Sequence, residues 1–306
     1  MKIFNNIHLI GTFVCVLSSN TIIAQQTPIT DTTDLLTTLE NENNSNTNNV
    51  NYTTATFKTT RLINGHTVEN VAKGVLDVKI NHRFGTLNTG AYQLFGLDNA
   101  TMRMGFDYGI TNNIMIGIGR STFQKTYDGF IKIKLLRQST GKINMPITLS
   151  YVATMAINSL KFTDTSRKNL FSSRVSYTHQ LIIGRKFSEN TSIQIMPTFI
   201  HRNLAETGEQ NDLLAIGIVG RQKLSKRISI NAEYYYLIPK YQLANTTNSL
   251  SIGFDIETGG HVFQLHFTNS RGMNERTFIS ETTGLWGKGD VLFGFNISRV
   301  FTIGKR

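Results

Sequence analysis

The sequence predicts an all-β protein: an antiparallel up-and-down transmembrane β-barrel of about 12 strands, preceded by a disordered N-terminal leader. Three observations predict it. From Val75 onward, apolar side chains alternate with small or polar ones. The alternating segments run for about 9–13 residues, which suits a tilted membrane strand better than a strand of a globular protein. Tight turns such as Thr258-Gly-Gly260 alternate with longer polar loops, as in membrane barrels.

Residues 1–24 have the pattern of a cleavable signal peptide. Lys2 supplies a positive charge, Ile7 to Leu17 is apolar, and Ala24 is a small residue at the expected cleavage point. A buried N-terminal helix is the alternative, but the chain turns polar abruptly after Ala24. We therefore expect export through the Sec pathway to the cell outer membrane. The single cysteine, Cys15, would leave with the signal, so no disulfide or thiolate metal site is expected.

Residues 25–60 form an acidic, Asn-rich leader, which we expect to be disordered because it has little apolar surface to bury. Residues 61–306 form the predicted barrel and carry 29 Lys and Arg against 16 Asp and Glu, within a net charge of +11 for the whole chain. Such an excess indicates nucleic acid, an anionic membrane surface or anionic solutes as partners. Export argues against nucleic acid. The expected partner is outer-membrane lipid, with a periplasmic protein and small anionic solutes as further candidates.

Twelve alternating segments account for the barrel. They begin near Gly74, Ala100, Asn113, Thr126, Pro146, Phe171, Ser192, Asp212, Arg227, Ser249, His261 and Gly289. A soluble sandwich or a lipocalin-like barrel would show the same alternation. Aromatic residues near strand ends, as in Tyr234-Tyr-Tyr236, favour the membrane barrel, and so does the alternating aromatic ending from Phe293 to Phe301.

Two sets of charged residues are candidates for binding in the lumen or at its periplasmic mouth. The first set precedes the first strand and comprises Arg61, His66 and Glu69. A His and a Glu could share a metal or a proton, but two ligands do not make a site. We therefore expect this segment to enter the barrel mouth and to pair its charges with lumen residues.

The second set lies on the polar faces of the predicted strands and comprises Arg83, Arg103, Asp107, Lys132 and Lys134. Opposite charges on neighbouring strands would form a ladder that fills the lumen. A surplus of bases would instead favour anions in a channel. Both interpretations remain open at the level of the sequence.

The sequence does not predict an enzyme. No Gly-x-Ser-x-Gly motif is present and the histidines are scattered, with His201 at a strand end and His66 as the candidates for a hydrolase. Gly117-x-Gly119 lies within a strand pattern, so it does not indicate a nucleotide site. No catalytic residue, cofactor or metal is expected.

Several motifs carry a family resemblance. They are the segment from Phe57 to Glu69, Asn81-His-Arg-Phe-Gly85, Leu94-Phe-Gly-Leu-Asp98, Gly117-Ile-Gly-Arg-Ser121, Tyr127-Asp-Gly-Phe130, Met196-Pro-Thr-Phe-Ile-His-Arg-Asn203 and Asn296-Ile-Ser-Arg-Val-Phe301. Together they resemble the domain of unknown function 5777 family of outer-membrane β-barrel proteins from Bacteroidota, over roughly Phe57 to Phe301. Thr67 stands where the family usually has Ser, and the hydroxyl is kept. The resemblance implies the fold and the location, but no activity.

The leading functional hypothesis is therefore a narrow pore or passive transport protein. In a more specific version of this hypothesis, the surplus of basic residues makes the pore prefer anions. The first alternative is a non-conducting membrane scaffold or anchor for a periplasmic partner. A third hypothesis, an outer-membrane hydrolase, has only scattered histidines in its favour. An open lumen would support the first and a plugged lumen the second.

Overall fold

A computed structural model describes residues 49–162, 166 and 168–303. All of them belong to one compact unit of the chain. The expected signal peptide (1–24) and residues 25–48 of the expected leader lie outside the described residues, so both remain predictions. Within the described residues, no helix is long and apolar enough to cross a membrane.

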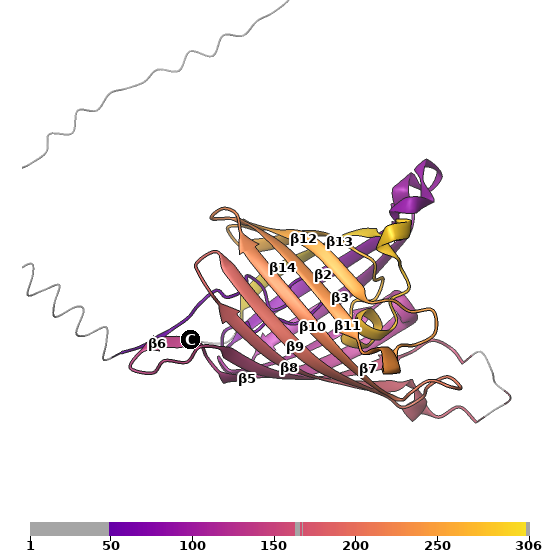
Figure 1. The fold of residues 1–306 in the computed structure, drawn as a ribbon, viewed down its shortest axis with the longest axis horizontal. Coiled ribbons are helices and arrows are strands. Elements are labelled where there is room, and N and C mark those ends of the chain that lie inside the picture. The colour runs from indigo at the N-terminus through magenta and orange to yellow at the C-terminus, as the bar shows by residue number, and fades with distance from the viewer. Residues whose placement is uncertain (1–48, 163–165, 167, 304–306) are drawn as a thin grey trace, which may run out of the picture. The chain divides into compact units, whose positions relative to one another are not determined.

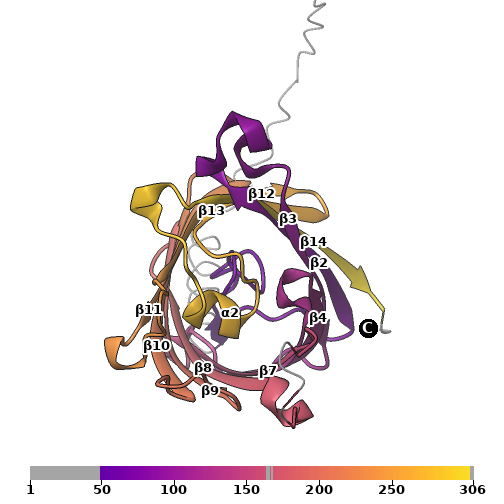
Figure 2. The same ribbon diagram turned by 90° about the vertical axis from the view of Figure 1, so that its right-hand side faces the viewer.

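Twelve antiparallel strands form a closed barrel in which the last strand pairs with the first (Figures 1 and 2). These strands are β2 (Val75–Thr86), β3 (Ala100–Gly109), β4 (Ile114–Ser121), β5 (Thr126–Leu136), β7 (Thr148–Asn158), β8 (Val175–Lys186), β9 (Thr191–Arg202), β10 (Asp212–Lys223), β11 (Ile228–Leu237), β12 (Ser249–Thr258), β13 (His261–Thr268) and β14 (Leu292–Thr302). The predicted barrel and its twelve segments are confirmed.

The remaining elements are short. β1 (Val50–Tyr52) pairs with β6 (Ser139–Gly141) in a separate two-stranded sheet, and α2 (Glu275–Ser280) is an α-helix between β13 and β14. Single turns of 3-10 helix are Leu87–Thr89, Ala91–Gly96, Phe123–Lys125, Phe171–Arg174, Pro239–Tyr241 and Trp286–Lys288.

The outer surface of the barrel is apolar and its inner surface is mainly polar. In β12, Ser251 and Asp255 face inward and are buried, whereas Ile252 and Phe254 face outward with 38% and 42% of their surface exposed. Large apolar side chains are exposed in the same way around the barrel. Apolar belts of this extent are unfavourable in water and match the hydrocarbon core of a membrane.

The connections differ between the two ends of the barrel. One end has the short turns 110–113, 187–190, 224–227 and 259–260 and the longer connection 137–147, and the other has the long loops 87–99, 159–174, 203–211, 238–248 and 269–291 and the short connection 122–125. In outer-membrane barrels the short turns face the periplasm and the long loops face outward. The two-stranded sheet of β1 and β6 lies at the short-turn end, because β6 belongs to the connection between β5 and β7.

The lumen is filled from both ends. The chain that precedes β2 runs inside the barrel from the short-turn end, and the loop with α2 folds inward from the long-loop end (Figure 2). We call residues 56–71 the lumen plug. Phe57, Leu62 and Val68 of the plug are at most 1% exposed. Disorder was expected as far as Thr60, but residues 49–60 are structured, because Phe57 joins an apolar cluster that offsets the entropy of ordering the chain.

Phe254 lies at the middle of β12 on the outer face, so Phe254→Lys should destabilise the barrel by about 2–4 kcal/mol in a bilayer. Thr258→Lys, at the end of the same strand, should cost only about 0–1 kcal/mol, because a lysine there reaches the interface. Guanidinium titrations of the protein folded in lipid vesicles would measure both values. Equal losses for the two variants would contradict a membrane-spanning β12.

Candidate functional site: the plugged lumen

The tip of the plug is a tight turn. Arg61 and His66 face each other in an antiparallel bridge, and Leu62 N donates to Gly65 O at 2.9 Å. Asn64 and Gly65 occupy the bend, and Asn-Gly is a strong turn signal. Glycine is also required by space, since a Cβ on residue 65 would overlap the hydroxyl of Tyr235.

A buried carboxylate on the barrel wall holds this turn. Glu233 of β11 is 1% exposed and accepts hydrogen bonds from three consecutive backbone N–H groups, those of Ile63, Asn64 and Gly65, at 3.0–3.4 Å. The Asn64 side chain donates a further bond to the same carboxylate at 2.7 Å. The N–H groups of the turn thereby gain an acceptor, and the buried carboxylate gains donors.

Amide and guanidinium groups on other strands bind the plug's carbonyl groups. Arg83 of β2 donates to Asn64 Oδ1 at 2.9 Å, and Asn296 of β14 donates to Ile63 O at 2.9 Å. Across the lumen, Gln194 of β9 donates to His66 O at 2.8 Å and accepts from Val68 N at 3.0 Å. The plug is thus bonded to opposite walls of the barrel.

Lysines on β2 and β5 both bind the plug at Thr60, Lys79 through the hydroxyl and Lys132 through the carbonyl oxygen. Lys79 Nζ lies 2.5 Å from Asp107 Oδ2 of β3, and Thr60 of the plug donates to the same oxygen at 3.1 Å. Lys132 is fully buried and donates to the carbonyl oxygens of Thr60, Thr67 and Glu69, at 3.3, 3.1 and 2.5 Å. Three carbonyl oxygens of the plug, rather than a carboxylate, are therefore the hydrogen-bond partners of the Lys132 ammonium.

The other predicted residues have different partners. Arg103 forms a wall-to-wall pair with Asp128 of β5, in which Nε lies 2.9 Å from Oδ1. Glu69 accepts from Thr56 N within the plug at 2.8 Å. Lys134 approaches Glu69 only to 4.0 Å, and both side chains are partly exposed, so that pair contributes little.

One carboxylate connects the plug to the inward-folded loop. Glu275 of α2 is fully buried, and its Oε1 accepts from Arg61 Nη1 at 2.7 Å. His66 Nε2 lies 3.4 Å from the same oxygen. Burial, together with the positive charges of Arg61 and Lys132, holds the pKa of His66 well below its usual value. His66 is therefore neutral, and its contact with Glu275 is not an ion pair.

An apolar cluster fills the space between the plug, α2 and the wall strands β4, β5 and β7 to β11. Phe57, Leu62 and Val68 of the plug and Phe278 of α2 belong to one buried cluster with wall residues. The wall members are Met115, Phe130, Val152, Ile182, Met196, Ile200, Leu213, Ala215, Val219, Tyr235 and Leu237. Phe278 packs edge-on against Tyr235, with ring centroids 4.9 Å apart. This cluster therefore resembles the core of a soluble protein.

Inside the barrel the charges nearly cancel. Among the described residues, the buried basic side chains are Arg61, Lys79, Arg83, Arg103, Lys132, Arg202 and Arg221, and the buried acidic ones are Asp77, Asp107, Asp128, Glu233, Asp255 and Glu275. The surplus of basic residues in the sequence therefore lies mostly at exposed positions. Among the described residues, the side chains buried in the barrel therefore comprise nearly equal numbers of basic and acidic groups.

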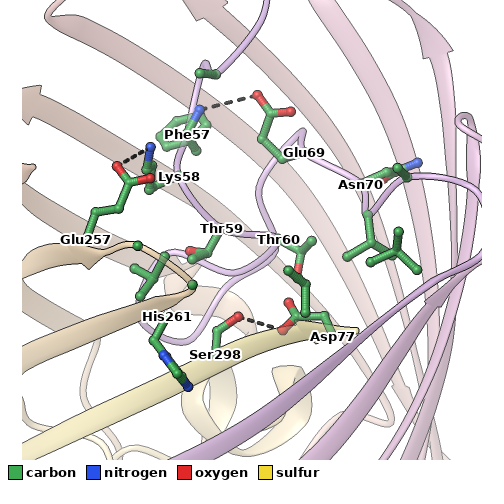
Figure 3. A pocket seen from close by; sticks show the side chains of 18 residues that line it. Phe57, Lys58, Thr59, Thr60, Glu69, Asn70, Asp77, Glu257, His261 and Ser298 are labelled. Carbon is green, nitrogen blue, oxygen red and sulfur yellow. Dashed lines mark hydrogen bonds and ion pairs between the residues drawn. The ribbon is translucent and has the colours of Figure 1, made fainter. Parts of the chain in front are cut away.

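A cavity of about 530 Å³ remains at the short-turn mouth, between the plug and the wall (Figure 3). Lys58 of the plug forms an ion pair there with Glu257 of β12, and Ser298 Oγ donates to Asp77 at 2.6 Å. The residues between this mouth and α2 are buried. The cavity is therefore a vestibule that ends against the plug.

All eight predicted residues belong to the plug or to inward-facing wall positions, and a charge ladder does form between β2, β3 and β5. Whether any of them binds a ligand remains a prediction. The sequence interpretation missed Glu233, Glu275, Gln194 and Asn296. Alternation along β11 and the Asn-Gly turn signal would have pointed to Glu233 and to the bend, whereas nothing local marks Glu275 as a lumen residue.

Of the two histidines considered for a hydrolase, His66 is buried in the plug and His201 lies outside the lumen. His201 Nδ1 is 2.6 Å from Asp212 Oδ1, and both side chains are well exposed at the long-loop end of β9 and β10. Among residues 49–162, 166 and 168–303, no three His, Cys, Asp or Glu side chains cluster as metal ligands do.

A closed barrel with an apolar exterior and a filled lumen defines an integral β-barrel protein of the outer membrane. The chain belongs to the family described as "Membrane bound beta barrel domain" (DUF5777), whose model matches residues 57–301. Comparison with curated proteins gave no match.

Among solved structures, three porins or channels are similar in fold. The NanC porin has 8% identity and a TM-score of 0.46, with 75% of this chain and 100% of that chain covered. The COG4313 outer membrane channel from Pseudomonas putida F1 has 11% identity and a TM-score of 0.45, with 76% and 98% covered. The KdgM porin has 8% identity and a TM-score of 0.44, with 74% and 99% covered.

Glu233→Ala should loosen the plug, because it leaves the N–H groups of the turn without their acceptor inside the barrel. We expect a loss of about 2–4 kcal/mol in the unfolding free energy. Trypsin should then cleave after Arg61, which is 2% exposed in the intact protein. Glu257→Gln breaks only the exposed pair with Lys58 and should cost at most ~1 kcal/mol. Cleavage after Arg61 in the Glu257 variant alone would contradict this assignment.

The lowered pKa of His66 predicts a pH dependence of stability. The unfolded chain binds a proton at His66 near pH 6.5, and the folded protein does so only at lower pH. Stability should therefore be independent of His66 well above pH 6.5 and fall as the pH drops below it, by up to ~1.4 kcal/mol per pH unit. Urea unfolding at pH 7.5 and 5 should show a larger loss in the wild type than in His66→Gln. Equal losses in the two proteins would show that His66 does not titrate differently on unfolding.

Proposed function

We propose that this protein is a non-conducting outer-membrane barrel, which serves as an anchor for a partner on its short-turn side. The observation that carries the proposal is the apolar cluster in the lumen, in which Phe57, Leu62 and Val68 pack against wall residues. Open channels have polar, water-filled interiors. Withdrawal of the plug would expose this apolar surface to water at a cost of about 25 cal/mol for each Å².

The attachment of the plug supports the same proposal. Its backbone is bonded to β2, β5, β9, β11 and β14, and Arg61 connects it to α2. A plug held from opposite walls and from both ends resists displacement. The chain N-terminal to the plug reaches the short-turn rim, where Val50–Tyr52 pairs with Ser139–Gly141, and this two-stranded rim is available to a periplasmic protein.

A gated pore is the second candidate, and the buried charged groups of the lumen favour it. Lys79, Arg83, Asp107 and Lys132 would be stable in water if the plug moved away. The near cancellation of buried charge gives such a pore little preference for anions. The two candidates predict different conductance once the plug is loosened.

Planar-bilayer recording separates them. The wild type should show no unitary conductance over a wide voltage range, and neither should the double variant Arg61→Ala/Glu233→Ala, in which the apolar packing still closes the lumen. Chymotrypsin cleavage after Phe57 or Leu62, each 1% exposed in the intact protein, would verify that the double variant is loosened. Conductance of the wild type would refute a closed barrel, and conductance of the double variant alone would establish the gated pore in place of the anchor.

A further inference from the structure

A groove of about 590 Å³ lies on the outer, membrane-facing surface of the barrel, across β3, β4, β5 and β7. Its floor is Gly129, which pairs with Ile118 of β4 and Met155 of β7. Ile118 is 65% exposed, whereas Ile116 on the same face of the same strand is 40% exposed. The difference arises because Gly129 provides no side chain to cover Ile118.

The packing of the barrel does not require glycine here. A Cβ on residue 129 would meet its nearest neighbours, Gly117 O and Ile118 Cγ2, at 3.6 and 3.9 Å, which are ordinary contacts. The backbone of Gly129 is not in the left-handed region either. Around this floor stand Met102, Met104 and Met155, whose flexible side chains adapt to an apolar guest.

The long-loop end of the groove is positively charged. Arg120 is exposed at the end of β4, and its guanidinium lies over the ring of Tyr127, 5.4 Å from the centroid. No carboxylate of the described residues forms an ion pair with Arg120. Lys125, in the connection to β5, is also exposed. Tyrosine and arginine at the end of membrane strands lie at the level of lipid headgroups, and arginine binds phosphate strongly.

We infer that this groove is a binding site for one anionic, phosphate-bearing lipid of the leaflet on the long-loop side. One acyl chain lies over Gly129 between the methionine side chains, and the headgroup phosphate pairs with Arg120. Apolar shape and charge complementarity together distinguish this site from the rest of the apolar belt. The inference does not depend on whether the lumen is open or closed.

Native mass spectrometry of the full chain, delipidated and then titrated with phosphatidylglycerol or phosphatidylcholine, tests the site. The wild type should retain one phosphatidylglycerol and bind phosphatidylcholine at least about tenfold more weakly. Arg120→Gln should lose most of this headgroup preference, and Gly129→Leu should lose the retained lipid altogether.

Gly220→Leu is the matched control. Gly220 also faces outward, on β10, and has open space above it, but it lies outside the groove. This variant should bind phosphatidylglycerol as the wild type does. Equal retention by Gly129→Leu and the wild type, or equal binding of the two lipids, would overturn the proposal and leave only ordinary lipid contact. If Gly129→Leu does not fold, Arg120→Gln still decides, because its exposed side chain makes no contact that folding requires.

Discussion

The closure of β14 onto β2 is the constraint on which the rest of the structure depends. In the hydrocarbon core an unpaired strand edge leaves N–H and C=O groups without partners, at several kcal/mol each. The pairing from Leu292↔Thr86 to Thr302↔Val75 removes that edge, with one irregularity near Leu292. Closure also fixes a lumen of limited width. Alternation then places one side chain of every two into that lumen, so the plug and the wall have to be complementary.

Two kinds of contact achieve this complementarity. Charges and amides on β2, β5, β9, β11 and β14 bind the plug's backbone directly. Apolar side chains on β4, β5 and β7 to β11 pack against Phe57, Leu62 and Val68 of the plug. Buried ionic contacts contribute little net stability, since desolvation offsets the attraction. Directional bonds therefore position the turn at Asn64 and Gly65, and the apolar packing supplies most of the stability.

The barrel could be predicted from the sequence because a strand's alternation is local. Each segment shows which of its residues face lipid, and the turn residues show where it ends. The plug could not be predicted in this way. Its bend depends on Glu233, which is 169 positions from Asn64, and residues 56–60 contain only one large apolar side chain. Tyr234-Tyr-Tyr236 illustrates both cases. Tyr234 and Tyr236 face lipid as expected, whereas Tyr235 packs inside the barrel against α2.

The position of the plug in the chain has a consequence for assembly. The plug precedes every barrel strand, yet its partners extend from β2 to β14, so the ring must form around a segment that was made first. A finished ring would have to admit the buried Arg61 and Phe57 through a narrow mouth. A plug present from the beginning would instead offer β2, β11 and β14 their bonding partners before the seam closes. The order of the chain thus favours insertion and closure as a single concerted event.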